Sequence, residues 1–189
     1  MQVALLGELR VRTGDDLVAL SAPKERAVLE MLALRAGLPV PVELLSEGLW
    51  GQGEPPSAAK VLQTYISHLR RALPPGSVVT TTSGYALALD GEGIDARRFE
   101  LAVAEARQLQ EAGEHRRAGD VLREALALWR SRPCPELVEH SWATAEVARL
   151  EELRRVAQDE LADARLAMGE HALLAGELEA AVAEEPFRE

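Results

Sequence analysis

The fold is decided by one stretch of the sequence, AAKVLQTYISHLRRAL at residues 58–73. The apolar positions that repeat with helical spacing in it are Leu62, Ile66, Leu69 and Leu73. Because an α-helix turns by about 100° per residue, this spacing stacks the four side chains on one face. Ser57 precedes the stretch as a candidate N-cap, and Pro-Pro-Gly at 74–76 follows it. The sequence therefore predicts an amphipathic helix.

The opposite face of this helix is polar and carries no acidic residue. Its members are Lys60, Gln63, Thr64, Ser67, His68 and Arg71, with Arg70 toward the edge. Such side chains offer hydrogen bonds to base edges and positive charge to phosphates. An ordinary solvated face can have the same composition, so the neighbouring elements have to decide between the two interpretations.

Those neighbours predict a compact DNA-binding layout. Helices are expected at 25–36 and 42–50, with only a short extended link between them. The runs at 78–82 and 85–89 are rich in β-forming residues and are separated by Ser-Gly, which predicts a hairpin. Strand-like runs within residues 3–20 predict a small antiparallel sheet. Three helices followed by a hairpin form the layout of a winged helix-turn-helix.

The same residues resemble a known family. The segments that carry the resemblance are LLGEL at 5–9, APKERA at 22–27, LSEGLWG at 45–51, LQTYISHLRRAL at 62–73 and SGY at 83–85. They are similar to the Streptomyces antibiotic regulatory proteins, which join an OmpR-type winged helix to a bacterial transcriptional activation domain. The resemblance covers nearly the whole chain. It implies a winged-helix DNA-binding domain at residues 1–92 and an activation domain at residues 93–189.

The resemblance also implies a function. Members of this family are cytoplasmic activators of biosynthetic gene clusters in actinobacteria, often for secondary metabolites. They bind direct repeats in double-stranded DNA and recruit RNA polymerase, so a homodimer on DNA is expected here. In this chain Lys60, Gln63, Thr64, Ser67, His68 and Arg71 would then face the major groove, and Arg70 the DNA backbone. The loop at 51–56 corresponds to the segment that OmpR-type activators present to polymerase.

The expected wing departs from the family pattern. Family hairpins commonly carry an arginine ahead of the Gly-Tyr pair, whereas Thr81, Thr82 and Ser83 stand there in this chain. Hydroxyl groups bond phosphates, but they carry no charge and release no counterion on binding. We therefore expect these three residues to contact DNA with a smaller contribution than is typical.

From Gly93 onward the chain consists almost entirely of Ala, Leu, Glu and Arg, which is a helical composition. Helices are predicted at 96–112, from 114 or 115 to about 130, and from about 142 to 168. The small or apolar positions Gly113, Ala118 and Ala125 have the same offsets as Gly169, Leu174 and Ala181, as in tetratricopeptide-like helix pairs. The expected fold class is mainly α with a small β part.

The resembling family usually continues with further helices beyond a stretch like residues 185–189. We therefore expect the tetratricopeptide-like domain of this chain to be truncated.

Composition excludes several other classes of protein. The single cysteine, Cys134, excludes a disulfide framework and a cysteine-rich zinc site. The sequence contains no P-loop, no dinucleotide fingerprint and no metal-ligand spacing, and its four histidines lie far apart. We therefore expect no enzyme, no catalytic residues, no cofactor and no metal site. No apolar run approaches the roughly 18 residues that a membrane span needs, so no membrane association is expected.

Charge leaves one alternative open. The chain has a formal net charge of -10, and most of the acidic excess lies after residue 92. A DNA-binding face therefore has to be a local concentration of positive charge. The alternative is a helical protein-interaction scaffold or antagonist whose winged helix binds DNA only weakly.

Overall fold

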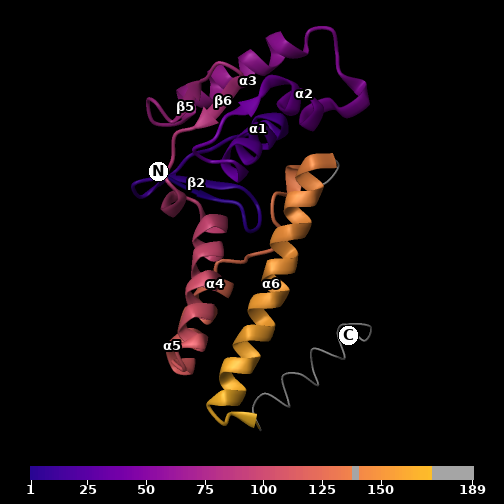
Figure 1. Ribbon diagram of the computed structural model, residues 1–189. Coiled ribbons are helices and arrows are strands. Elements are labelled where there is room, and N and C mark those ends of the chain that lie inside the picture. Colours follow the sequence, from indigo (N-terminus) through magenta and orange to yellow (C-terminus); the bar gives the residue numbers. More distant parts are fainter. Residues whose placement is uncertain (138–140, 172–189) are drawn as a thin grey trace. The chain divides into compact units, whose positions relative to one another are not determined.

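The structure is a computed structural model, and it describes residues 1–137 and 141–171. Packing divides the chain into two compact units. The first contains Met1–Arg98 and Leu128–Glu152, and the second contains Phe99–Ala127 and the residues from Leu153 onward. Figure 1 shows the elements of both.

The first unit is built from two small sheets and three helices. Its elements are β1 (Gln2–Ala4), β2 (Arg10–Thr13), β3 (Asp16–Leu17), α1 (Pro23–Leu34), β4 (Val40–Pro41), α2 (Val42–Trp50), the 3-10 turn η1 (Gly51–Gly53), α3 (Ala58–Ala72), β5 (Val78–Thr80), β6 (Gly84–Leu87) and η2 (Gly91–Gly93). The order of the first sheet is β1-β2-β3, with both pairs antiparallel, as the sequence predicts. The three helices and the hairpin of β5 and β6 confirm the winged-helix layout.

A third strand joins the wing, and the sequence did not predict it. The short link before α2 forms β4, which pairs antiparallel with β6 so that the sheet has the order β4-β6-β5. Gly84 makes this pairing possible, because a Cβ atom added there would lie 2.0 Å from the carbonyl oxygen of Val40. The two strands can approach this closely only with glycine at that position.

The apolar faces of the three helices form the core of this unit. The fully buried side chains include Leu29, Leu32, Leu45, Leu62, Ile66 and Leu69. Ser57 is the N-cap of α3, as predicted, but its hydroxyl makes no capping hydrogen bond, and the N-cap of α1 is Ala22, which has no side chain that could cap. Burial of apolar area, rather than capping, therefore stabilises these helices.

The start of α4 (Asp95–Glu111) and the segment after Leu128 belong to the packing of the winged helix. The carboxylate of Asp95 accepts hydrogen bonds from the backbone N–H groups of Leu5 and Leu6, at 2.6 and 3.1 Å. The N–H of Arg130 donates to the carbonyl of Leu6, and that of Cys134 donates to the carbonyl of Leu5, at 2.8 and 3.1 Å. The compact units therefore do not follow the sequence division at residues 92 and 93, which stays a prediction.

The turn η3 (Pro135–Leu137) extends this packing onto α1. The guanidinium of Arg26 binds the carboxylate of Glu136, with Nε and Oε1 separated by 2.7 Å. Glu30 follows Arg26 by four positions in α1 and is fully buried. Burial raises the pKa of Glu30 to about 8, and the nearby Glu136 carboxylate adds to the increase.

The second unit contains most of α4, α5 (His115–Leu126) and the part of α6 (Ser141–Ala167) after Glu152. Arg107 of α4 binds Glu160 of α6 at 2.6 Å. Ala118 and Ala125 are buried, as expected for closely packed helix pairs, and Gly113 forms the turn between α4 and α5 with a φ of 78°. In the second predicted repeat, residues 174 and 181 lie outside the described residues.

The end of α5 differs from its predicted position near residue 130. The helix ends at Leu126, and Arg130 instead has its backbone N–H bonded to the carbonyl of Leu6. The last helical bond of α5 is the one from the N–H of Ala127 to the carbonyl of Arg123, and the N–H of Arg130 makes a long-range bond instead. Among the described helices, none combines the length and the low charge that crossing a membrane requires.

Candidate nucleic-acid interface

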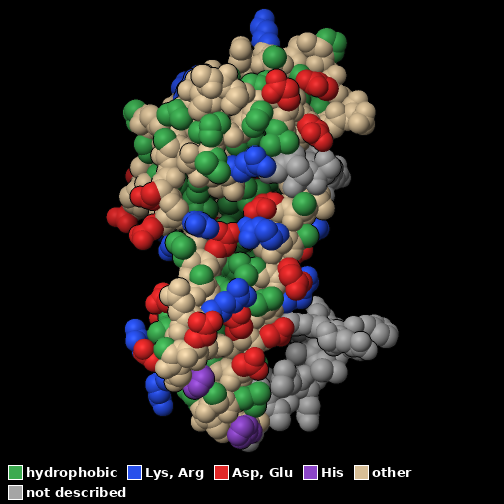
Figure 2. Space-filling model, viewed as in Figure 1, with side chains coloured by type: hydrophobic (Ala, Val, Ile, Leu, Met, Phe, Trp, Pro, Cys, Tyr) green, Lys and Arg blue, Asp and Glu red, His purple; other side chains and the backbone are tan. Residues whose placement is uncertain are grey.

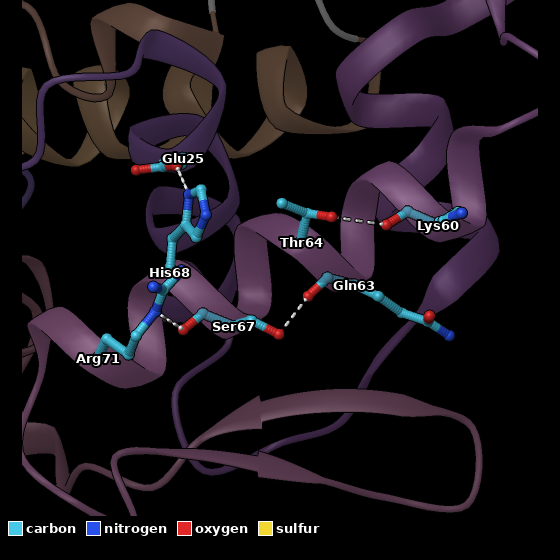
Figure 3. A network of polar contacts seen from close by, with 7 residues as sticks. All are labelled: Glu25, Lys60, Gln63, Thr64, Ser67, His68 and Arg71. Carbon is cyan, nitrogen blue, oxygen red and sulfur yellow. Dashed lines mark hydrogen bonds and ion pairs between the residues drawn. The ribbon is translucent and has the colours of Figure 1, made fainter.

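The candidate interface is the outward face of α3, and its burial pattern matches the sequence expectation. Leu62, Ile66 and Leu69 have exposed fractions of 1% or less. The polar residues Lys60, Gln63, Thr64, Ser67 and Arg71 are all exposed. Figure 3 shows these five side chains and His68 projecting from one helix. The structure therefore brings all six predicted groove-facing residues together on α3.

Two hydroxyl groups on this face are bonded to their own helix. The Thr64 hydroxyl donates to the carbonyl oxygen of Lys60 at 3.1 Å, and the Ser67 hydroxyl donates to that of Gln63 at 2.8 Å. A hydroxyl group has one donor and two acceptor sites. Since the donor of each is engaged, Thr64 and Ser67 present acceptor sites to the outside, which suits the amino groups of adenine or cytosine.

Two basic side chains lie at opposite ends of the outward face of α3. Lys60 lies in the first turn and Arg71 in the last, where a cation also interacts favourably with the helix dipole. Arg71 donates through Nε to the carbonyl of Ser67 at 3.4 Å, a long contact, and its side chain stays exposed. Arg71 therefore leaves charge available for a phosphate.

His68 is held by an acidic residue from another helix. Its Nδ1 atom lies 2.5 Å from Oε1 of Glu25, which belongs to the first turn of α1 (Figure 3). The exposed fraction of the side chain is 42% for His68 and 13% for Glu25. The face of α3 alone carries no acidic residue, but the assembled surface has one beside His68.

Arg70 connects α3 to the wing. Its Nε donates to the carbonyl of Val78 at 3.0 Å, and its Nη2 donates to the hydroxyl of Thr80 at 2.7 Å. The guanidinium also lies 5.9 Å from the centre of the Tyr85 ring, within the range of a cation-π contact. The fork of Arg70 is thus occupied by β5, and the residue positions the wing against the helix.

The three predicted wing residues lie at the turn between β5 and β6. The hydroxyl of Thr81 accepts a hydrogen bond from the N–H of Gly84 at 3.1 Å, so this side chain stabilises the turn. Thr82 and Ser83 are exposed. The wing tip therefore exposes the neutral hydroxyl groups of Thr82 and Ser83, while the half-buried hydroxyl of Thr81 also takes part in the turn.

We find no second candidate site among the other described residues. The described residues include no group of three metal-ligating side chains. In the second unit, acidic and basic side chains are interspersed on the visible helix surfaces, as Figure 2 shows. Arg123 and Asp120, for example, form an exposed ion pair at 2.7 Å. Such pairs three positions apart are typical of helix faces that contact solvent.

Sequence reasoning did not identify Glu25 or the wing contacts of Arg70. Glu25 is 43 positions from His68 and lies on a different helix, so no spacing rule connects them. The contacts of Arg70 with the wing have a weak signal in the sequence, because Arg70 lies at the edge of the polar face of α3 and the next element along the chain is the strand β5.

Comparisons with known proteins agree with this geometry. Residues 16–87 match the family described as "Transcriptional regulatory protein, C terminal", and residues 94–189 match the bacterial transcriptional activator domain. The whole chain is 36% identical to the regulatory protein DnrI of Streptomyces peucetius and covers 74% of it. It is 30% identical to the regulatory protein AfsR of Streptomyces griseus, of which it covers only 19%.

A solved structure shows the same fold. The Mycobacterium tuberculosis protein EmbR, in complex with a low-affinity phosphopeptide, superposes on 99% of this chain with a TM-score of 0.92 and 28% identity. The chain spans 51% of that EmbR chain.

Proposed function

Because the chain belongs to the Streptomyces antibiotic regulatory protein family, we propose that it activates transcription by reading specific DNA sites with the outward face of α3. The matched domains and relatives are transcriptional regulators and not enzymes. The single observation that supports the DNA-reading role is the outward face of α3 from Lys60 to Arg71, to which the helix itself contributes no acidic residue.

The dimensions and chemistry of α3 suit the major groove. Its 15 residues extend for about 22 Å, and a groove about 12 Å wide accepts a helix. We assign Gln63, Thr64 and Ser67 to base edges, since an amide can bind adenine through two hydrogen bonds. Lys60 and Arg71 are assigned to phosphates, which set the register of the helix on DNA.

The wing has a smaller role in this proposal. Thr82 and Ser83 offer hydroxyl groups to the phosphate backbone, and Thr81 maintains the turn between them and β6. Arg70 acts chiefly by fixing the wing to α3. Neutral contacts release no counterions, so most of the salt dependence should come from α3.

Specificity requires more than one copy of the chain. A single winged helix reads only a short half-site, so we propose that two copies bind direct repeats as a homodimer on DNA. The exposed loop from Gly51 to Pro56 is the proposed contact with RNA polymerase. We also propose that the chain regulates a biosynthetic gene cluster in the cytoplasm, and its similarity to the regulatory proteins DnrI and AfsR supports a regulatory role.

Mobility-shift and footprinting experiments test the proposal. Duplexes from the region upstream of the chain's own gene should be retarded at low salt, and the footprint should cover two half-sites. Lengthening the spacer by half a helical turn should abolish joint binding, because it moves the second half-site to the other side of the duplex.

Two substitutions on α3 separate contact from folding. Arg71→Ala should weaken DNA binding and reduce the slope of log K against log salt by about 1, with the fold unchanged. Leu69→Ala removes a fully buried side chain and should lower the free energy of unfolding by about 2–5 kcal/mol. Equal loss of folding in both variants would argue against the assigned face.

Two observations favour a second function, that of an interaction scaffold or antagonist. The wing tip carries no basic residue among Thr81, Thr82 and Ser83, and the formal net charge is -10. The mobility-shift experiment decides between the two functions. Absence of any shift at low salt, with a folded chain, would favour the scaffold.

A further inference from the structure

We propose that Glu25 is a positioning residue for DNA recognition, which holds His68 by Nδ1 so that Nε2 is the ring atom offered to DNA. This inference rests on the proposed function, because it assigns Glu25 a role at the same DNA-reading face. Glu25 itself touches the histidine and not the DNA.

The contact joins two helices that are distant in sequence. Oε1 of Glu25 in α1 lies 2.5 Å from Nδ1 of His68 in α3, with the ring directed toward α1 (Figure 3). Only 13% of the Glu25 side chain is exposed, against 42% for His68. The carboxylate is therefore the fixed partner, and the imidazole is the one that reaches the surface.

The position of Glu25 keeps its carboxylate in place. Glu25 lies in the first turn of α1, where the helix dipole favours a negative charge. No side chain caps this helix at Ala22. The backbone N–H of Glu25 donates to the carbonyl of Ala22 at 3.1 Å, which anchors the residue in the turn.

The chemistry of the pair determines what His68 presents. An ionised carboxylate only accepts hydrogen bonds, so Nδ1 must carry a proton in this contact. Within the described residues, no hydrogen bond engages Nε2. A neutral ring then offers Nε2 as an acceptor for a base amino group, and a charged ring offers an N–H to a phosphate or to guanine.

Orientation before binding should strengthen the complex. A side chain that is already held loses less conformational freedom when it meets its partner. We expect Glu25→Ala to weaken DNA binding by about 3- to 10-fold, which is the size of the ordering cost for one side chain. Glu25→Gln keeps an acceptor oxygen for Nδ1, so it should weaken binding less than Glu25→Ala does.

Whether Glu25→Ala weakens or tightens DNA binding distinguishes a positioning role of Glu25 from a purely electrostatic one. A carboxylate near the DNA repels phosphates, so its removal should tighten binding if charge were its only contribution. Glu43 supplies a matched control, because it is an exposed acidic residue in the first turn of α2. Glu43→Ala should leave DNA affinity unchanged or raise it slightly.

A double-mutant cycle tests the proposal. The probe is the duplex that the wild-type chain selects from a random 30-base-pair library, used in fluorescence anisotropy at fixed salt. The variants are Glu25→Ala, Glu25→Gln, His68→Ala and the double alanine variant, each checked for folding by circular dichroism. In the His68→Ala background, Glu25→Ala should no longer weaken binding.

Each outcome supports or overturns the inference. Weaker binding by Glu25→Ala that disappears without His68 supports it. Tighter or unchanged binding, or an equal loss in both backgrounds, overturns it. If Glu25→Ala fails to fold, Glu25→Gln carries the test, and a loss that persists without His68 again overturns the inference.

Failure of the proposed function would look different. Recovery of no duplex from the library would reject DNA reading itself, and the inference with it. If Arg71→Ala weakens binding while Glu25→Ala does not, the proposed function stands and the role of Glu25 is rejected.

Discussion

Replacement of Asp95 by alanine should destabilise the first compact unit strongly. Asp95 is only 4% exposed, and its carboxylate accepts hydrogen bonds from the N–H groups of Leu5 and Leu6. It also accepts one from Ala96 at 2.8 Å, and Nη2 of Arg130 lies 3.6 Å from its Oδ2. These contacts attach the start of α4 to the end of β1.

The size of the loss follows from the groups left without a partner. Leu5 and Leu6 are fully buried, so no water replaces the carboxylate at their N–H groups. Each unsatisfied buried group costs about 1–3 kcal/mol. Burial raises the pKa of Asp95, although the hydrogen bonds from the backbone lower it. Desolvation of the carboxylate therefore offsets part of the stability that these hydrogen bonds contribute. We expect a net loss of about 2–4 kcal/mol, a large share of a typical 5–15 kcal/mol.

Urea denaturation of the full chain, followed by circular dichroism, measures this loss. Asp90→Ala is the matched control, since Asp90 is exposed and accepts one hydrogen bond from the N–H of Gly93 at 3.1 Å. The control should lose about 1 kcal/mol or less. Asp95→Asn keeps one acceptor oxygen and should fall between the two. A loss for Asp95→Ala no larger than for Asp90→Ala would refute the reasoning.

Two further predictions concern the wing and the buried carboxyl. Arg70→Lys keeps the charge but not the fork that binds Val78 and Thr80, so amide exchange in β5 should accelerate and DNA binding should weaken as in Arg70→Ala. Full DNA affinity in the lysine variant would instead indicate a role through charge alone. Glu30 has a folded-state pKa of about 8, above its ordinary 4.5, because of burial and then Glu136. The wild type should therefore lose up to about 5 kcal/mol of stability as pH rises from 4.5 to 8, and Glu30→Gln should remove that slope in urea midpoints. Parallel pH profiles of the two proteins would contradict this.

Local signals in the sequence were sufficient for the main helices. The predicted range of α2, residues 42–50, agrees with the structure because Pro41 and Gly51 mark its ends. The apolar stripe of α3 is buried as predicted, since a period of 3.6 residues determines which side chains share a face. The polar face of α3 follows from the same period.

Short and long-range features were not predictable in this way. The two residues of β4 are too few to show an alternating pattern, and their pairing with β6 spans more than 40 positions. The backbone hydrogen bond between Arg130 and Leu6, which follows the end of α5 at Leu126, joins residues more than 120 positions apart, and no local rule contains it. Segments that are distant in sequence become neighbours only through packing.

The sequence by itself determined which residues lie on the outward face of α3, because helical periodicity is a local property of the chain. Only the tertiary structure decided how those residues are engaged. Packing of α1 against α3 places Glu25 beside His68, and packing of the wing occupies the guanidinium of Arg70. Packing also made residues 128–137 and 141–152 part of the winged-helix unit. These contacts depend on distances between elements, and the order of residues along the chain does not encode them locally.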